Sequence, residues 1–207
     1  MSTEKLKINL NNFSFIEREC SKNNKTKTNR CLRDFLYYAL HFYYPKKFNN
    51  EELNAEKIED QRLFGFKIKE GFPFGGGQYS KITPFLNENN LYLEVNNKKI
   101  RNLWDFILAF FFKNLSYKKL IIFINKNIEN NIPIGIDVPA GLVMDHVMFV
   151  YKIDEKGIYL IDSHKAPNIP YTNISNESGK FVMFMNFKDL KRIWNWRGLV
   201  WVVKKSS

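Results

Sequence analysis

The sequence predicts an α+β protein with helices in its first part and an antiparallel sheet in its second. The chain has 207 residues, of which 44% are hydrophobic and 26% charged, as is typical of a soluble globular domain. Up to about residue 117, apolar residues recur mainly at helical spacing. From about residue 118, short β-branched and aromatic runs of strand length follow one another. We therefore expect one main domain over 31–207, with a helical part at about 31–117 and a sheet part at about 118–207.

Residues 1–30 are predicted to form an N-terminal arm and a polar loop before this domain. Residues 1–20 alternate weakly and fit a strand, whereas residues 21–30 are rich in Asn and Lys and fit a loop. The main domain then begins with a helix over 31–43, which Pro45 ends. The apolar residues of this helix recur at the spacing of a buried face: Leu32, Phe35, Leu36, Ala39 and Leu40.

Two more helices are predicted before the sheet, a polar one over 49–60 and an apolar one over 100–115. A loop rich in glycine and aromatic residues lies between them and contains Gly75, Gly76, Gly77 and Gln78. We interpret this loop either as a simple connection or as one wall of a substrate cleft, because glycine lets the backbone approach a ligand closely. No Lys-Ser or Lys-Thr pair follows the glycines, so the loop does not fit a phosphate-binding motif.

The second part of the chain predicts six strands and one short helix. A hairpin turn is expected at 154–157, and a short helix at 187–194 before the last strand. The predicted strands are 120–124, 134–138, 146–153, 157–161, 181–186 and 199–203.

Composition also limits the partners and the compartment. The net charge of +11 is spread along the chain without a run of five basic residues, which gives little support for nucleic-acid binding. Two cysteines are too few for a disulfide scaffold or a Cys-only zinc site, and we predict no metal and no cofactor. No apolar stretch fits a secretory signal or a membrane span, so we expect a cytoplasmic protein with free thiols.

Cys31 is the candidate nucleophile because it opens the 31–43 helix. The free N–H groups and the positive end of a helix dipole stabilise a thiolate, and Arg30 and Arg33 act in the same direction. The alternative is a small apolar residue at the start of a core helix. Cys20 fits the role less well, because it follows acidic residues and opens no apolar helix.

A thiol nucleophile needs a base, and the chain has three histidines. His41 lies about 15 Å from Cys31 along the same predicted helix, too far for direct pairing. His146 opens an apolar strand, and the turn at 154–157 returns the chain so that Asp162 lies beside it. This pair predicts a base and its orienting carboxylate; His164 is the alternative for either role, or else a plain loop residue. Considered alone, His146 also fits a histidine with a purely structural place in a strand. Asp162 considered alone also fits a turn residue at the end of a strand.

The order of these residues resembles the papain-like cysteine peptidase superfamily, and within it the compact peptidases that remove double-glycine leaders from bacteriocins. The likeness extends over about 31–203 and is patchy between about 46 and 120. Residues 31–40 resemble the nucleophile helix of that family, and residues 145–162 its histidine strand, hairpin and aspartate strand. Two further stretches are similar to the helix-to-strand junction and the closing helix and strand: 128–137 and 181–203.

The resemblance implies a papain-like fold with the cysteine on the helical lobe and the histidine and aspartate on the sheet. It implies cleavage of a peptide or amide bond in a peptide or protein substrate through an acyl-enzyme intermediate. Cys31 would be the nucleophile, His146 the general base and acid, and Asp162 the residue that orients it. An acyltransferase on the same scaffold and a non-catalytic papain-like module with a basic surface are the alternatives.

The oxyanion hole is the part of the site that departs from the family. Its members usually carry a glutamine six residues before the cysteine, where this chain has Lys25. Asn24 and Asn29 are the amides near that position, and we take them as oxyanion-hole candidates. The glycine that usually follows the cysteine is replaced by Leu32.

Overall fold

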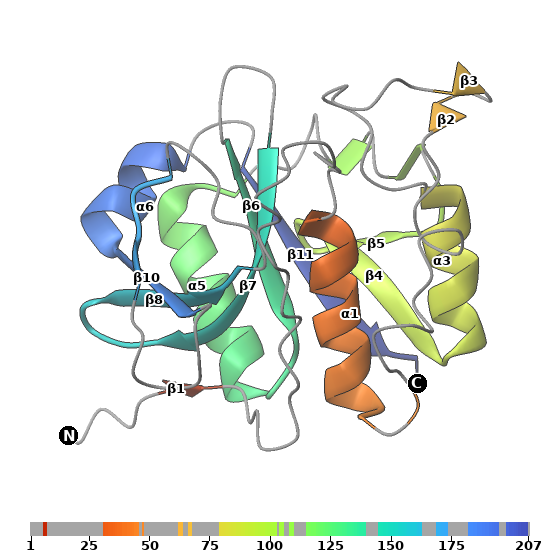
Figure 1. Cartoon of the computed structure of the whole chain (residues 1–207), viewed down its shortest axis with the longest axis horizontal. Coiled ribbons are helices and arrows are strands. Elements are labelled where there is room, and N and C mark those ends of the chain that lie inside the picture. Colours follow the sequence, from red (N-terminus) through yellow and green to blue (C-terminus); the bar gives the residue numbers. More distant parts are fainter. Residues whose placement is uncertain are drawn as a thin grey trace, which may run out of the picture.

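The computed structural model describes residues 6–7, 31–45, 47, 62–63, 66–67, 79–102, 104–105, 108–109, 115–139, 145–162, 169–173, 182–194 and 198–206. These residues form a mixed α+β structure in which helices surround one large sheet (Figure 1). The sheet has the strand order β5-β4-β11-β6-β7-β8-β10-β9, and β1 pairs with β7 outside this path. Every strand pairing in the described residues is antiparallel.

The strands of the large sheet vary from two to nine residues in length. They are β1 (Leu6–Lys7), β4 (Leu91–Val95), β5 (Lys98–Ile100), β6 (Ile134–Pro139), β7 (Asp145–Ile153), β8 (Gly157–Ile161), β9 (Thr172–Asn173), β10 (Val182–Asn186) and β11 (Leu199–Lys205). A separate two-stranded sheet joins β2 (Arg62–Leu63) to β3 (Phe66–Lys67). The main helices are α1 (Cys31–Tyr43), α3 (Tyr79–Glu88), α5 (Tyr117–Glu129) and α6 (Phe187–Ile193).

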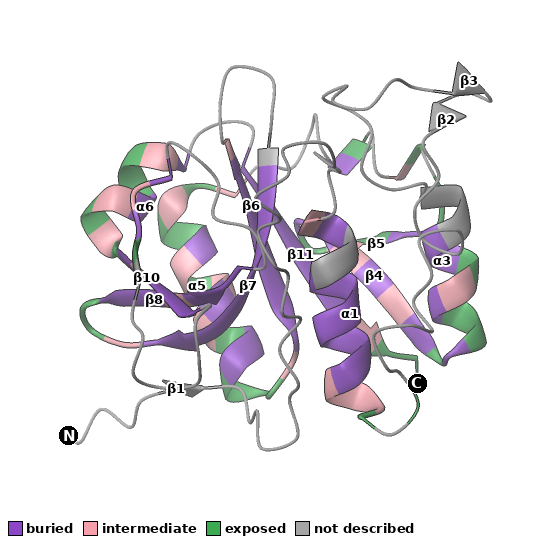
Figure 2. Ribbon diagram, viewed as in Figure 1, coloured by how far each residue is buried: buried purple, intermediate pink, exposed green. Residues whose placement is uncertain are grey.

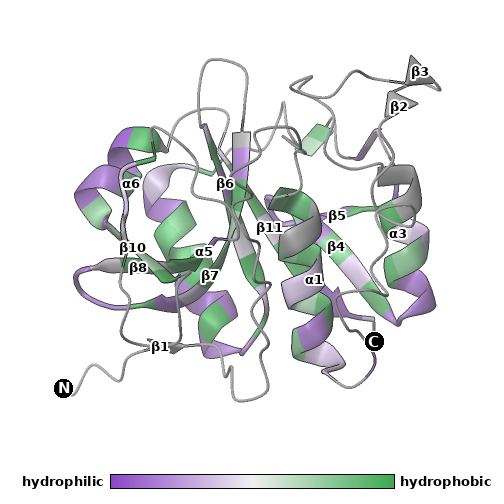
Figure 3. Cartoon of the chain, in the orientation of Figure 1, coloured by the Kyte–Doolittle hydropathy of each residue, from purple (hydrophilic) through white to green (hydrophobic). Residues whose placement is uncertain are grey.

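The core lies along the middle strands of the sheet. The first five residues of both β6 and β11 are buried without alternation, so both faces of these strands are covered. Figure 2 shows the middle strands buried along their length, and Figure 3 shows hydrophobic residues on the same strands. The sides of α5 and α6 that point away from the sheet are exposed and more hydrophilic, as expected for helices that pack through one face.

Helix α1 packs directly on β6 and β7. Phe35 is 1% exposed, and its ring centroid lies 6.2 Å from that of Phe149 on β7. A Cβ atom added at Gly135 of β6 would lie 2.7 Å from the Phe35 ring, so only glycine allows this approach. At the other end of α1, the Tyr43 hydroxyl donates to the backbone oxygen of Val203 on β11, at 2.9 Å. These contacts fix the helix at both ends.

Most of the predicted elements after residue 130, and the first helix, are confirmed. The 31–43 helix has the predicted bounds, and the turn after β7 is closed by a hydrogen bond from the Asp154 N–H to the Gly157 oxygen, at 3.1 Å. The remaining confirmed elements are the strands predicted at 134–138, 146–153, 157–161, 181–186 and 199–203 and the helix predicted at 187–194, with small differences in their bounds.

The strand predicted at 120–124 is wrong, because these residues lie inside α5. Leu120, Ile124, Asn127 and Ile128 are the buried residues of this helix, and their spacing is that of one helical face. Ser116 caps the helix by accepting a hydrogen bond from the Lys119 N–H. The β-branched residues that favour a strand locally are thus overridden by the helical spacing of the buried positions and by the cap.

The apolar helix predicted over 100–115 is also wrong at its start, because Ile100 ends β5. Residues 91–100 form a β-hairpin, β4–β5, whose two turn residues Asn96 and Asn97 have φ values of 50° and 64°. Helical turns are described at 104–105 and 108–109. The sheet therefore includes strands from the part of the chain that was expected to be helical, and α5 lies within the expected sheet part.

Several predicted features lie outside the described residues. They are the helix predicted at 49–60, the loop with Gly75, Gly76, Gly77 and Gln78, and residues 1–30 apart from β1. In the described part of the chain, no helix has the length and apolar character needed to cross a membrane.

Candidate active site

Cys31 is the first residue of α1 and its thiol is not in a disulfide. The residue is partly buried, whereas Leu32 next to it is 5% exposed and belongs to the core. The first N–H groups of a helix have no acceptor within the helix, and the dipole places partial positive charge there. The local fold thus places the Cys31 side chain at the end of α1 where these N–H groups lie.

His146 and Asp162 come from the two strands of the β7–β8 hairpin. His146 is the second residue of β7 and pairs with Val138 of β6, and Asp162 follows directly after β8. The pairing of Phe149 with Ile161 brings the start of β7 and the end of β8 together. His146 is 6% exposed and Asp162 is 2% exposed, so the pair is buried.

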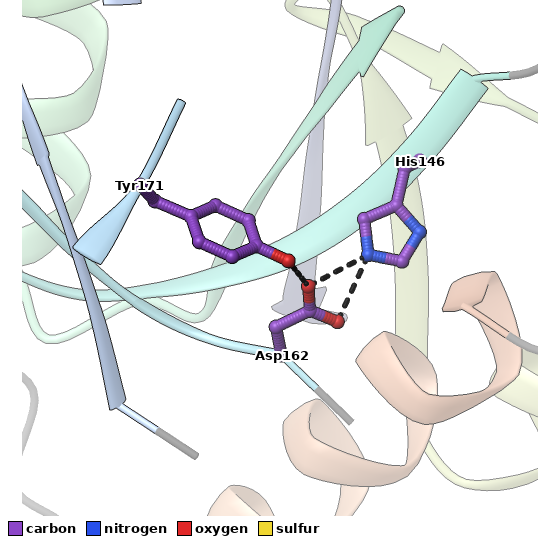
Figure 4. A network of polar contacts seen from close by, with 3 residues as sticks. All are labelled: His146, Asp162 and Tyr171. Atoms are coloured by element: carbon purple, nitrogen blue, oxygen red, sulfur yellow. Dashed lines mark hydrogen bonds and ion pairs between the residues drawn. The ribbon is translucent and has the colours of Figure 1, made fainter. Parts of the chain in front are cut away.

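The side chains of His146 and Asp162 make a direct hydrogen-bonded contact. The Nε2 atom of His146 lies 2.9 Å from Oδ1 and 2.9 Å from Oδ2 of Asp162 (Figure 4). Oδ2 also accepts a hydrogen bond from the hydroxyl of Tyr171, at 2.8 Å. The carboxylate is therefore held between the imidazole and the phenol.

The nucleophile candidate Cys31 also acts on the His146 ring. The Cys31 side chain lies beside His146, among the groups that act on the charge of its imidazole. Since Nε2 faces Asp162, Nδ1 is the ring nitrogen available to the thiol, and Figure 4 shows it on the side of the ring away from Asp162. The three residues thus form a thiol–imidazole–carboxylate series.

The charge on His146 follows from these contacts. Burial lowers the pKa of His146, but the charge of Asp162 and its hydrogen bond raise that pKa, and the contacts with Cys31 raise it further. The result is a pKa well above the ordinary value of 6.5. His146 is thus held between the Asp162 carboxylate and the Cys31 side chain, the two groups that act against the effect of burial on its pKa.

The structure brings together the three residues that the sequence singles out as catalytic candidates, Cys31, His146 and Asp162. His41 lies ten residues after Cys31 on α1, where its ring stacks on Tyr37 with centroids 5.7 Å apart. The other candidates lie outside the described residues: Cys20, Asn24, Asn29, Gly75, Gly76, Gly77, Gln78 and His164.

Tyr171 is the residue of this network that sequence reasoning missed. It precedes β9, whose Thr172 pairs with Phe184 of β10, and β10 in turn pairs with β8. Its hydroxyl reaches Asp162 through this pairing, across a sequence separation of nine residues. No spacing or motif marks such a tyrosine, because its position depends on a two-residue strand that carries almost no sequence signal.

The described residues contain no group of three or more His, Cys, Asp or Glu side chains placed to hold a metal ion. A thiol beside an imidazole that a carboxylate orients is an arrangement for nucleophilic catalysis. No protein-family model matches the chain, and no curated protein matches it in sequence. The chemistry of the site is therefore argued from its own geometry.

Proposed function

We propose that this protein is a papain-like cysteine hydrolase that cleaves a peptide or amide bond. The observation that supports the proposal is the grouping of three side chains: the His146 imidazole bonds the Asp162 carboxylate, and the Cys31 thiol lies beside the same imidazole. Each member has the environment its role requires: a thiol at a helix N-terminus, a buried imidazole and a buried carboxylate.

The reaction begins with transfer of the thiol proton from Cys31 to Nδ1 of His146, which gives a thiolate and an imidazolium. The sulfur attacks the carbonyl carbon of the substrate, and the C–N bond breaks as Nδ1 returns its proton to the leaving amine. The product of this half is a thioester on Cys31. Water then attacks the thioester while His146 takes its proton, and the acid is released as the thiol forms again.

Asp162 supports both halves of this reaction. Its contact with Nε2 keeps the ring turned so that Nδ1 faces the sulfur. Its negative charge stabilises the imidazolium, in agreement with the raised pKa of His146, whose burial alone acts in the opposite direction. The free N–H groups at the start of α1 offer donors for the negative oxygen of the tetrahedral intermediate.

The test is the rate of alkylation by iodoacetamide as a function of pH, with the labelled cysteine identified by mass spectrometry. We expect Cys31 to react rapidly near pH 6, where an ordinary thiol with a pKa of about 8.5 is almost unreactive. The His146→Ala variant should lose this reactivity and follow the profile of an ordinary thiol. Cys20→Ala is the matched control, and it should keep the fast reaction that Cys31→Ala abolishes.

Two results would overturn the proposal: an inert Cys31, or a Cys31 whose profile is the same with and without His146. If Cys31 is reactive, incubation with thioester and peptide donors follows. Accumulation of acyl-Cys31 that an added amine resolves and water does not would assign acyl transfer in place of hydrolysis.

A further inference from the structure

Tyr171 contacts the candidate site through a hydrogen bond to Asp162. Its hydroxyl donates to Oδ2 of Asp162 at 2.8 Å, and the same oxygen lies 2.9 Å from Nε2 of His146. Tyr171 is 9% exposed and Asp162 is 2% exposed, so water has little access to this contact. A buried hydrogen bond to a carboxylate is stronger and more directional than a neutral one at the surface.

The position of Tyr171 is set by β9 and β10, which lie beyond β8 in the sheet. Its backbone N–H donates to the oxygen of Ile169 at 3.0 Å, and the next two residues form β9 on the outer side of β10. The hydroxyl therefore approaches Asp162 from a different strand than the one that carries His146. The carboxylate is held from two directions, by Tyr171 and by His146 (Figure 4).

We propose that Tyr171 is a positioning residue for His146, whose hydroxyl fixes the Asp162 carboxylate against Nε2 and so holds Nδ1 toward Cys31. This inference rests on the proposed function, since it assigns a role within that site. Tyr171 acts through Asp162, and its hydroxyl bonds to the carboxylate and not to the imidazole.

The physical basis is the freedom of an aspartate carboxylate to rotate. The terminal torsion of aspartate has a broad energy profile, so the two equal contacts with Nε2 require something that fixes the rotation. The Tyr171 hydroxyl supplies this by holding one of the two oxygens. Within the described residues, the groups that act on the charge of His146 are Asp162 and Cys31. Loss of the Tyr171 bond should therefore change the titration of His146 through Asp162.

The chain offers a matched control in the same sheet. The hydroxyl of Tyr159 donates to Oδ2 of Asp154 at 2.9 Å, in the turn between β7 and β8. Tyr159→Phe removes the same kind of bond as Tyr171→Phe, between the same two residue types. Asp154 is not among the groups that act on His146. A general effect of losing a tyrosine–aspartate bond would appear in both variants, whereas a positioning effect would appear only in Tyr171→Phe.

The experiment compares wild type, Tyr171→Phe and Tyr159→Phe by NMR titration of the His146 imidazole and by alkylation of Cys31. The His146 signal is assigned from its absence in His146→Gln. In Tyr171→Phe we expect the midpoint of the His146 titration to fall by about one pH unit, the size of a weakened hydrogen bond to a charged group. Alkylation of Cys31 at pH values above the new midpoint should fall about tenfold. Tyr159→Phe should match wild type in both measurements.

Replacement of Tyr171 by p-aminophenylalanine keeps the ring and an N–H donor and should restore the wild-type midpoint. A His146 midpoint in Tyr171→Phe that equals or exceeds that of wild type would overturn the inference, as would a failure of the p-aminophenylalanine variant to restore it. If Cys31 is unreactive in every variant, the proposed hydrolase function fails, and the His146 titration still decides whether Tyr171 positions the pair.

Discussion

Replacing Gly135 by alanine is expected to push α1 away from β6 and to separate Cys31 from His146. The new Cβ atom would lie 2.7 Å from Cδ2 and 2.8 Å from Cε2 of Phe35, whereas ordinary van der Waals contact begins at 3.4 Å. The difference, 3.4 − 2.7, means that the ring must retreat by about 0.7 Å. Phe35 is 1% exposed and packs against Phe149, so the ring has no free space to turn into.

The backbone of α1 must then absorb the displacement. Cys31 lies four residues before Phe35, about 6 Å along the helix axis, so it moves with the ring. Overpacking of this kind costs about 1–3 kcal/mol of unfolding free energy. A displacement of about 1 Å between reacting groups lowers a rate by about 100-fold, so the expected loss in Cys31 alkylation lies between about 10-fold and 100-fold.

The assay measures the unfolding free energy in urea and the alkylation rate of Cys31 near pH 6 on the same samples. Adding Phe35→Leu to Gly135→Ala removes ring atoms from the clash and should recover part of the alkylation rate. Gly198→Ala is the matched control, because its Cβ would lie 2.8 Å from the Trp194 ring, far along the chain from α1. It should lose stability without slower alkylation. A folded Gly135→Ala variant that is alkylated at the wild-type rate would refute the reasoning.

Three other substitutions test the His146–Asp162 pair, the packing of the β7–β8 hairpin on β10, and the bond between the β4–β5 turn and β11. Asp162→Asn should cost about 3–5 kcal/mol of unfolding free energy near pH 6. Burial lowers the pKa of His146, but Asp162 raises it well above 6.5. The stabilisation by the His146–Asp162 pair is therefore complete below about pH 6.5, and it disappears as the pH rises through the pKa of His146 in the folded protein. Gly157→Ala should cost about 3 kcal/mol in urea unfolding, because its Cβ would overlap a backbone oxygen of β10. Asn96→Gly keeps the positive φ but loses the bond from the Val200 N–H to the Asn96 side chain, at 2.9 Å, and should cost about 1–3 kcal/mol in the same assay.

Two of these expectations have a control within the chain. Asp154→Asn removes a carboxylate that bonds Tyr159 and not His146, and its effect should not diminish between pH 6 and pH 9. Asn96→Asp keeps the acceptor oxygen for Val200 and should be milder than Asn96→Gly. A cost of Asp162→Asn that is the same at pH 6 and pH 9, or a Gly157→Ala variant as stable as wild type, would contradict the corresponding argument.

The sequence was sufficient to predict the His146–Asp162 contact because that contact is local. A hairpin with a short turn has a register that can be counted, and His146 and Asp162 lie on either side of it. The contact of Cys31 with His146 is of another kind. It depends on the approach of Phe35 to Gly135, a packing relation between residues 100 positions apart that no periodic pattern encodes.

The two wrong predictions, the strand at 120–124 and the helix over 100–115, also result from tertiary contacts that a local pattern does not contain. Residues 120–124 are β-branched and aromatic, and they become helical because Leu120 and Ile124 share a buried face with residues one turn further along. The β4–β5 hairpin alternates buried and partly buried residues over only five positions in β4, and its two-residue Asn-Asn turn is a weaker signal than Asn-Gly. In both cases the short local pattern does not contain the tertiary contacts that decide the structure.

The place of β11 in the sheet has a consequence for biosynthesis. Among the described strands it is the last to leave the ribosome, yet it lies between β4 and β6 and is the only strand that joins the β4–β5 hairpin to the others. It also accepts the hydrogen bond from Tyr43 that anchors the end of α1. A nascent chain that ends before residue 199 therefore has its proposed catalytic residues but lacks the strand that unites the sheet. The described sheet can therefore be completed only after residues 199–205 have been made.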